Sequence, residues 1–170
     1  MLRDRCRPGV QILFVGINPG IRSAAIGHHF AGYSNRFWKL LYASGLIPEP
    51  IGAEEDAKLC DWGFGITNLI ARMTPGIDTL KPHEYPAGLR ILRRKVRRWR
   101  PRIVAFVGVS LYRVIFGKKG PLKLGPQKEL FEGAQVFVLP NPSGRNANYS
   151  YTEMLAAFRT LARLRARMRR

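Results

Sequence analysis

The stretch with the clearest potential for chemistry is a short turn that follows an apolar run. The residues Ile12–Val15 favour a β-strand, Gly16 stops the run, and Asn-Pro-Gly follows at 18–20. Proline fixes its own backbone and pushes Asn18 toward an extended conformation, while Gly16 and Gly20 let a ligand approach the main chain. Such a loop would hold the Asn18 amide in a fixed direction for a ligand. The alternative is a turn with a purely structural part.

Composition limits the kinds of partner that the protein can have. The 170 residues fit a single domain, 1–170, with basic tails at 1–8 and 163–170 that are expected to fray. Lysine and arginine total 29 against 11 acidic residues, and the net charge of +18 favours a polyanion such as nucleic acid, with ribosome or membrane-surface contact as alternatives. The apolar runs are too short to span a bilayer and the N-terminus lacks the apolar stretch of a signal peptide, so a cytoplasmic protein is expected. Cys6 and Cys60 lack the paired spacing of a zinc site and are expected to be reduced thiols.

The remaining pattern alternates strands with helices. Strands are predicted at 10–15, 63–70, 103–107 and 136–139, and helices at 34–45, 53–60, 84–100, 110–116 and from 150 onward, with a loop at 21–33. This alternation predicts an α/β fold, a three-layer α/β/α sandwich with a mostly parallel central sheet. Ligands of such sheets bind outside the carboxyl ends of the strands, so the loops 16–33, 71–86 and 140–148 are expected to converge.

For two sets of side chains a structural role is favoured over a role in ligand binding. Phe37 and Trp38 fall on the apolar face of the predicted helix at 34–45 and are expected in the core. The arginines between Arg90 and Arg102 lie largely off the apolar stripe of their helix and are typical of a solvated face. If that face meets DNA, it would add affinity that depends on salt and not on sequence.

Three motifs, in this order, resemble the mismatch-specific uracil/thymine-DNA glycosylase family. They are GINPG at 16–20, GHHFAGYSNRFWKLLYASGL at 27–46 and LPNPSGRN at 139–146, and the likeness runs from Val10 to Phe158. The resemblance implies the uracil-DNA glycosylase fold. It also implies hydrolysis of the N-glycosidic bond of uracil in DNA, with no metal and no other cofactor, leaving an abasic site. Thymine and other modified pyrimidines, mispaired with guanine, are further candidate substrates.

The resemblance assigns the catalytic part to two asparagines. Asn18 would position the attacking water, because an amide oxygen accepts a hydrogen bond from water although it cannot take a proton at ordinary pH. Catalysis would then rest on geometry and on stabilising the departing base, and turnover is expected to be slow. Asn68 is Asn in the thymine-DNA glycosylase branch and Lys in a bacterial branch, and it would hold the water or read the pyrimidine edge. Its structural alternative is a strand-end amide that satisfies its own turn.

The same resemblance assigns the base pocket. Phe30 would stack on the flipped base, and Gly16, Ile17 and His29 would form the rest of the base-binding wall; a core aromatic is the alternative for Phe30. His28 and His29 are adjacent and have no Cys, Asp or Glu near them in the sequence, so a metal site is not expected.

The last motif resembles the loop that enters the duplex gap left by the flipped nucleotide. Asn141, Ser143 and Gly144 belong to it, Ser143 as a candidate phosphate contact, and Arg145 is the candidate wedge. Bacterial members have an apolar residue at this place and a later arginine, whereas this chain reads Arg-Asn-Ala from Arg145. This difference leaves open how the loop would recognise a guanine opposite the flipped nucleotide, and with it whether mispairs are preferred.

These observations favour a monofunctional DNA glycosylase of base-excision repair. Its partner would be double-stranded DNA that contains uracil or a mismatched pyrimidine, with single-stranded DNA as a further partner, and it would act as a cytoplasmic, nucleoid-associated bacterial monomer without membrane contact. A non-catalytic binder of damaged DNA or RNA with the same fold is the alternative. A small nucleotide- or sugar-modifying α/β enzyme fits the fold but not the charge, and no Walker-type or dinucleotide glycine motif is present.

Overall fold

The chain folds around one five-stranded sheet with the order β2-β1-β3-β5-β4, in a computed structural model that describes residues 2–168. The strands are β1 (Ile12–Gly16), β2 (Phe64–Asn68), β3 (Ile103–Val107), β4 (Gly125–Phe131) and β5 (Ala134–Leu139). Strands β2, β1, β3 and β5 run parallel to one another, and β4 pairs antiparallel with β5 at the edge. The parallel strands therefore end at the same edge of the sheet.

Alternate side chains of the buried strands feed two separate cores. In β1, Ile12 and Phe14 pack on one side of the sheet, whereas Leu13 and Val15 pack on the other. All residues of β1 and β3 are buried. Central parallel strands covered on both faces have this pattern, which explains why they read as continuous apolar runs in the sequence.

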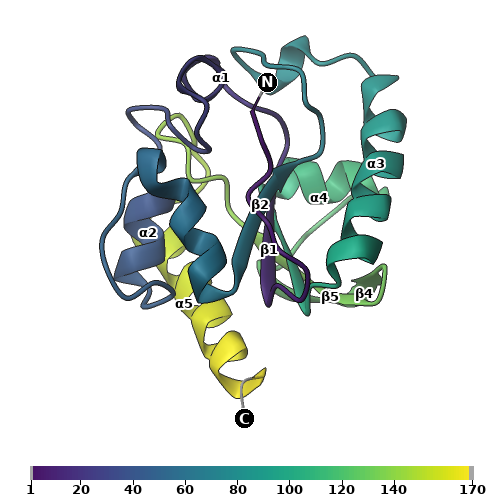
Figure 1. Ribbon diagram of the computed structural model, residues 1–170. Coiled ribbons are helices and arrows are strands. Elements are labelled where there is room, and N and C mark those ends of the chain that lie inside the picture. Colours follow the sequence, from purple (N-terminus) through teal and green to yellow (C-terminus); the bar gives the residue numbers. More distant parts are fainter. Residues whose placement is uncertain (1, 169–170) are drawn as a thin grey trace.

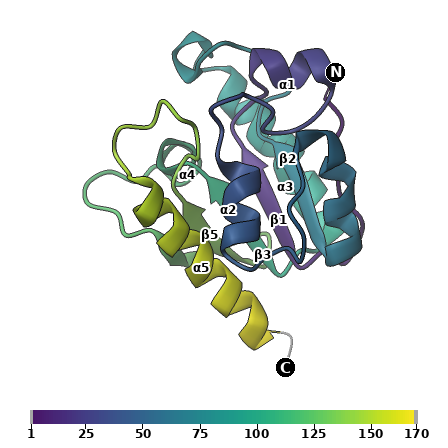
Figure 2. The ribbon, with the colours of Figure 1, turned by 90° about the vertical axis from the view of Figure 1, so that its left-hand side faces the viewer.

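Helices cover both faces of the sheet (Figure 1). On one face pack α2 (Phe37–Ala43), the 3-10 segment η1 (Ala53–Trp62) and α5 (Tyr151–Met168), and on the other α3 (Glu84–Trp99) and α4 (Val109–Phe116). The short elements α1 (Ile21–Ile26) and η2 (Ile77–Thr79) belong to the loops after β1 and β2. Figure 2 shows α2 and α5 in front of the sheet and α3 behind it. These three layers confirm the predicted α/β class with a mostly parallel sheet. Within residues 2–168 no helix combines the length and the apolar character needed to cross a bilayer.

The edge strand β4 was not among the predicted strands. It contains the polar run Gln127–Glu129, of which Lys128 is exposed, and its burial alternates along the strand instead of staying complete. Glu132 and Gly133 join it to β5 with φ angles of 48° and 83°, the two positive values that a tight hairpin of type I′ requires. Polar residues at a sheet edge are common, because one side of an edge strand faces water.

Two boundaries differ from those predicted around the first loop. The segment 21–33, expected to be a loop throughout, contains α1. The helix expected to be capped by Ser34 begins at Phe37, whose amide donates to Oδ1 of Asn35 at 2.9 Å. As predicted, Phe37 and Trp38 are buried in the core.

Both predicted basic tails make contacts within the described residues. The main chain of Arg5 pairs with Ile66 of β2, and α5 continues to Met168. The fraying of the tails stays a prediction. Arg165 explains this continuation, because its guanidinium donates to Oε1 of Gln11 at 2.8 Å and to the carbonyl oxygen of Trp62 at 2.7 Å. Residues 1, 169 and 170, also within the predicted tails, lie outside the described residues.

Candidate active site

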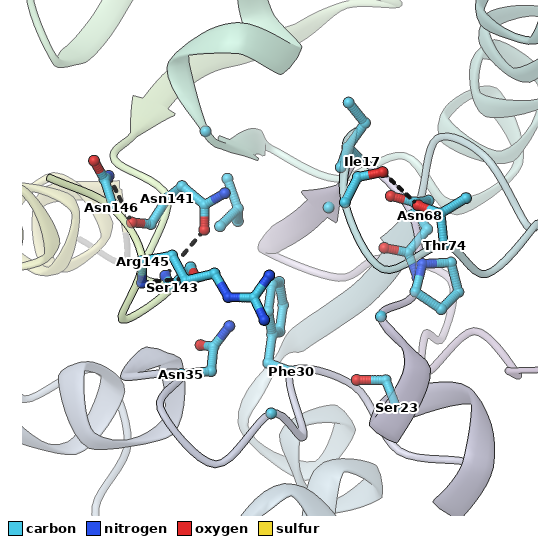
Figure 3. Close-up of a pocket in the computed structure, with 18 of the residues that line it drawn as sticks. Ile17, Ser23, Phe30, Asn35, Asn68, Thr74, Asn141, Ser143, Arg145 and Asn146 are labelled. Atoms are coloured by element: carbon cyan, nitrogen blue, oxygen red, sulfur yellow. Dashed lines mark hydrogen bonds between the residues drawn. The ribbon is translucent and has the colours of Figure 1, made fainter. Parts of the chain in front are cut away.

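A cleft of about 830 Å³ opens at the carboxyl edge of the parallel strands. The loops after β1, β2 and β5 contribute to it, as predicted from the order of strands and helices. The turn between β3 and α4 contributes as well, which the sequence did not suggest; there Gly108 has a φ of 126° and the chain passes from strand to helix at once. Figure 3 shows residues of these loops facing one another across the cleft.

The Asn18 side chain is held in one orientation by the loop after β2. Its Nδ2 donates to the carbonyl oxygen of Arg72 at 2.9 Å and to Oγ1 of Thr74 at 2.8 Å, and the Thr74 hydroxyl in turn donates to the carbonyl oxygen of Gly76 at 2.8 Å. A carbonyl can only accept, so the amide nitrogen must face Arg72. The Asn18 Oδ1 has no hydrogen-bond partner among residues 2–168. It is left available to accept a hydrogen bond in the cleft.

The loop that presents the Arg72 carbonyl is itself fixed to α3. The Arg72 side chain donates from Nε to Oε1 of Glu84 at 2.7 Å and from Nη2 to Oε2 at 2.8 Å. The Arg72 guanidinium lowers the pKa of Glu84 to about 2, so this fork stays charged over the physiological range. Thr74, which sequence reasoning missed, is buried below the cleft. No local pattern marks it, because its partner Asn18 is 56 residues away.

Gly16 makes room for Asn68 and Phe30. Gly16 and Asn68 are opposite each other in the β1–β2 register. A Cβ atom placed on Gly16 would lie 2.6 Å from Oδ1 of Asn68 and 3.5 Å from Cζ of Phe30. The Asn68 side chain makes no hydrogen bond to any residue between 2 and 168, so its amide can both donate to and accept from a ligand. Next to Gly16, the Ile17 carbonyl accepts from the Ile70 amide at 2.8 Å, which joins the two loops.

Phe30 forms an aromatic wall of the cleft. Its ring stacks on Phe37 with a centroid distance of 4.1 Å and an interplanar angle of 22°. The ring is half-buried and also lines the cleft, so it belongs to the core on one side and to the site on the other. The φ of Phe30 is 50°, a left-handed value that is rare for a bulky residue and typical of functional sites.

His29 supports this wall from behind. Its side chain is buried, and its ring Nε2 lies 2.7 Å from the carbonyl oxygen of Arg3. Its main-chain carbonyl accepts a hydrogen bond from Nε1 of Trp38 at 3.0 Å. His29 also lines the cleft, so these contacts fix both the predicted base-binding residue and Phe30 beside it, and the base contact of His29 stays a prediction.

A buried carboxylate, Asp56, anchors the same loop and was missed by sequence reasoning. Its two oxygens accept from Nε of Arg5 at 3.1 Å and from the main-chain amide of His29 at 2.9 Å, and Nδ1 of His28 lies 3.1 Å from Oδ1. An acidic residue thus lies near the histidine pair in space, although none is near them in the sequence. In the part of the chain from 2 to 168, however, no three His, Cys, Asp or Glu side chains are grouped to hold a metal.

The burial of His29 predicts a loss of stability in acid. Burial lowers the pKa of His29, so the unfolded chain binds this proton more tightly than the folded protein does. The stability that the neutral His29 ring contributes is fully present above the unfolded-state pKa of about 6.5. As the pH falls below that value, the free energy of unfolding decreases by up to about 1.4 kcal/mol per pH unit. Urea unfolding between pH 7 and pH 5 measures this, with His29→Gln as the variant that keeps a donor but no titrating ring. Parallel pH profiles of the two proteins would contradict the assignment.

The loop after β5 is held by hydrogen bonds within itself. The Asn141 Oδ1 accepts from the Ser143 amide at 3.0 Å, the Asn141 carbonyl accepts from Nδ2 of Asn146 at 2.9 Å, and the Ser143 Oγ accepts from the Arg145 amide at 3.2 Å. Arg145 is exposed, and its side chain extends from this loop into the cleft in the direction of Phe30 (Figure 3). The predicted wedge is therefore carried by a preformed loop.

A second set of contacts fixes this loop to the chain before α2. A Cβ atom on Gly144 would lie 2.6 Å from Cβ of Ser34, so only glycine allows this approach. The main-chain amide of Arg36 donates to the carbonyl oxygen of Pro142 at 2.9 Å. The Arg36 side chain donates from Nη2 to the carbonyl oxygen of Ser143 at 3.1 Å. The wedge loop and the loop that carries Phe30 thus form one rigid rim.

Comparisons with known proteins identify a family and a similar fold. The family model of the uracil DNA glycosylase superfamily matches residues 3–162. The fold is similar to the solution structure of a proposed uracil DNA glycosylase from Methanosarcina acetivorans, with a TM-score of 0.63 and 19% identity over 95% of this chain and 96% of that one. The narrower resemblance to the mismatch-specific uracil/thymine branch stays a prediction.

Proposed function

The chain belongs to the uracil DNA glycosylase superfamily, and we propose that it hydrolyses the N-glycosidic bond of uracil in DNA as a monofunctional glycosylase. The observation that carries this proposal is the orientation of Asn18, whose nitrogen is tied to Arg72 and Thr74 while its oxygen is left for a water. The product would be an abasic site and the free base. Duplex DNA is the proposed substrate, with single strands as a second one, and the protein would act as a monomer where the genome lies, in the cytoplasm.

The proposed mechanism uses placement more than proton transfer. As the bond to the base lengthens, positive charge grows on the sugar and negative charge on the base. A water held by the Asn18 Oδ1 would attack the sugar carbon as its bond to the base nitrogen breaks, and the proton that the water loses would reach the released base anion through solvent. The unpartnered Asn68 amide would donate to the departing pyrimidine. Phe30 would stack on the flipped base, since its ring already forms a flat wall of the cleft. Thymine and G-mispaired pyrimidines would enter the same pocket.

A cleavage assay on labelled DNA tests the proposal. The substrates carry uracil opposite guanine, uracil opposite adenine, thymine opposite guanine, or uracil in a single strand, and alkali reveals abasic sites. Strand breaks that appear only after alkali are the expected result. Strong salt-sensitive binding without any base release would contradict the proposal and favour a non-catalytic binder of damaged DNA.

Arg145→Ala is expected to act mainly on duplex substrates. Base extrusion costs a few kcal/mol in a duplex, and a side chain that fills the gap slows the return of the base. The exposed position of Arg145 on a fixed loop suits this part. We expect about tenfold slower release from duplex DNA, from about 1.4 kcal/mol of lost stabilisation, and little change on a single strand.

Arg159→Ala is the matched charge control, because it removes an exposed arginine from α5. Release rates measured under single-turnover conditions compare the two variants on both substrates. An equal loss on single strands and duplexes would argue against a wedge at Arg145.

A further inference from the structure

An aromatic ring lies open to solvent at the mouth of the cleft. Tyr33 is 88% exposed, the largest value among the exposed large hydrophobic side chains of residues 2–168, and it lines the same cleft as Asn18 and Phe30. Exposing a large ring forgoes the burial that usually stabilises such a side chain. A single exposed ring is common on protein surfaces, and Tyr33 is distinguished by its place in the lining of the cleft and by the contact that holds it there.

One face of the Tyr33 ring is already occupied. The guanidinium carbon of Arg22 lies 4.0 Å from the ring centroid, and Nε of Arg22 donates to the carbonyl oxygen of Ala31 at 2.9 Å. The arginine thus holds the ring by a cation–π contact and is itself fixed to the main chain. The opposite face of the ring stays open, and the ring needs little further ordering before it binds another flat group.

Tyr33 belongs to the same rigid rim as the candidate wedge. It lies in the turn closed by the hydrogen bond from the Asn35 amide to the Gly32 carbonyl, at 3.0 Å. The next residue, Ser34, packs directly against Gly144 of the wedge loop. In Figure 3, Asn35 of this turn lies on the same side of the cleft as Arg145. The open ring and the arginine are therefore held on two loops that contact each other.

We infer that Tyr33 stacks on the base next to the extruded nucleotide, through the ring face that Arg22 leaves open. The inference rests on the proposed function in taking DNA with a nucleotide out of the stack as the ligand. When a nucleotide leaves the stack, the neighbouring base loses a partner and exposes its π face. Stacking on an aromatic side chain replaces that partner whatever the DNA sequence, because every base has a π face. Arg22 against the ring, with Glu54 Oε1 4.0 Å from its Nη2, and Arg145 in the lining of the same cleft supply positive charge for the adjoining phosphates.

Binding to a duplex with a tetrahydrofuran abasic-site analogue tests the inference without any base release. Fluorescence anisotropy compares this duplex with the same duplex undamaged. We expect Tyr33→Ala to weaken binding of the analogue duplex by about 5- to 150-fold, the factor for losing one stacked base, and to leave the undamaged duplex unchanged. Tyr33→Phe should bind like the wild type. Tyr42→Ala, which removes a 48% exposed tyrosine of α2, is the matched control and should not change binding.

Unchanged affinity of Tyr33→Ala for the analogue duplex would overturn the inference, and so would an equal loss on both duplexes or a loss in Tyr33→Phe as large as in Tyr33→Ala. Thermal unfolding of each variant verifies that the fold is kept. The uracil-release assay separates the two proposals. If the wild type releases no uracil but Tyr33→Ala loses affinity selectively, the proposed function fails and the inference stands. If uracil is released and the affinity is unchanged, only the inference fails.

Discussion

Asn18→Ala is expected to lower uracil release by at least about 100-fold while DNA affinity stays within about twofold of the wild type. The variant removes the oxygen that would hold the water but leaves the cleft rim and the surface charge intact. Misplacing a reactant by about 1 Å is enough to cost 10²-fold in rate, and here the positioned water is lost altogether. Single-turnover release and anisotropy with the same uracil duplex measure the two quantities.

Gln127→Ala provides the matched control for the loss of an amide. The Gln127 Nε2 also donates twice, to the carbonyl oxygens of Lys123 and Gly125, but on β4. Gln127→Ala should leave both uracil release and DNA affinity unchanged.

Thr74→Val is a graded version of the Asn18→Ala test, because it keeps Asn18 and removes one of the two acceptors that orient its amide. We expect a loss of about tenfold there. Wild-type turnover in Asn18→Ala would remove Asn18 from its proposed part.

Gly16→Ala should also disable the site, although no polar group is removed. The new Cβ would lie 2.6 Å from Oδ1 of Asn68, a distance that real Cβ atoms do not tolerate, so the Asn68 amide must move out of its place. We expect release to fall by about 10- to 100-fold. The free energy of unfolding should change little, because the displaced oxygen is the end of a side chain that makes no hydrogen bond within residues 2–168, and Phe30 Cζ at 3.5 Å is at ordinary contact distance. Release rates and urea unfolding are the measurements.

A double-mutant cycle identifies the cause of the Gly16→Ala effect. Asn68→Ala removes the oxygen that the new Cβ would meet, so adding Gly16→Ala to it should cost little more activity. The cycle would then show a coupling of about 1–2 kcal/mol, within the range for residues in contact. Purely additive losses would mean that Gly16→Ala acts through Phe30 or the backbone, and not through Asn68.

Several short segments that determine the fold were predictable from local sequence patterns. The apolar run at Ile103–Val107 became β3 with these bounds. Of the apolar stripe Leu89, Leu92, Val96 and Trp99, the last three are buried in α3, and Leu89 is partly buried against the same core. The sequence Ser150-Tyr-Thr-Glu153 is typical of a capping box, and the box forms: the Ser150 amide donates to Oε1 of Glu153 at 2.9 Å and the Glu153 amide donates to the Ser150 Oγ at 3.1 Å. These features depend on residues one to four positions apart, and short-range periodicity and capping preserve them in the sequence.

The sequence by itself determined that the loops after β1, β2 and β5 meet at the cleft, because parallel strands must end at one edge, but it did not suggest the turn between β3 and α4. Only the tertiary structure decided what each side chain does there. Asn18 is oriented by a carbonyl 54 residues away, Asp56 lies below the histidines of another loop, and His29 turns its ring Nε2 toward Arg3. The physical reason is that hydrogen-bond partners and buried ion pairs are chosen by packing between distant segments, on which local propensity has no influence.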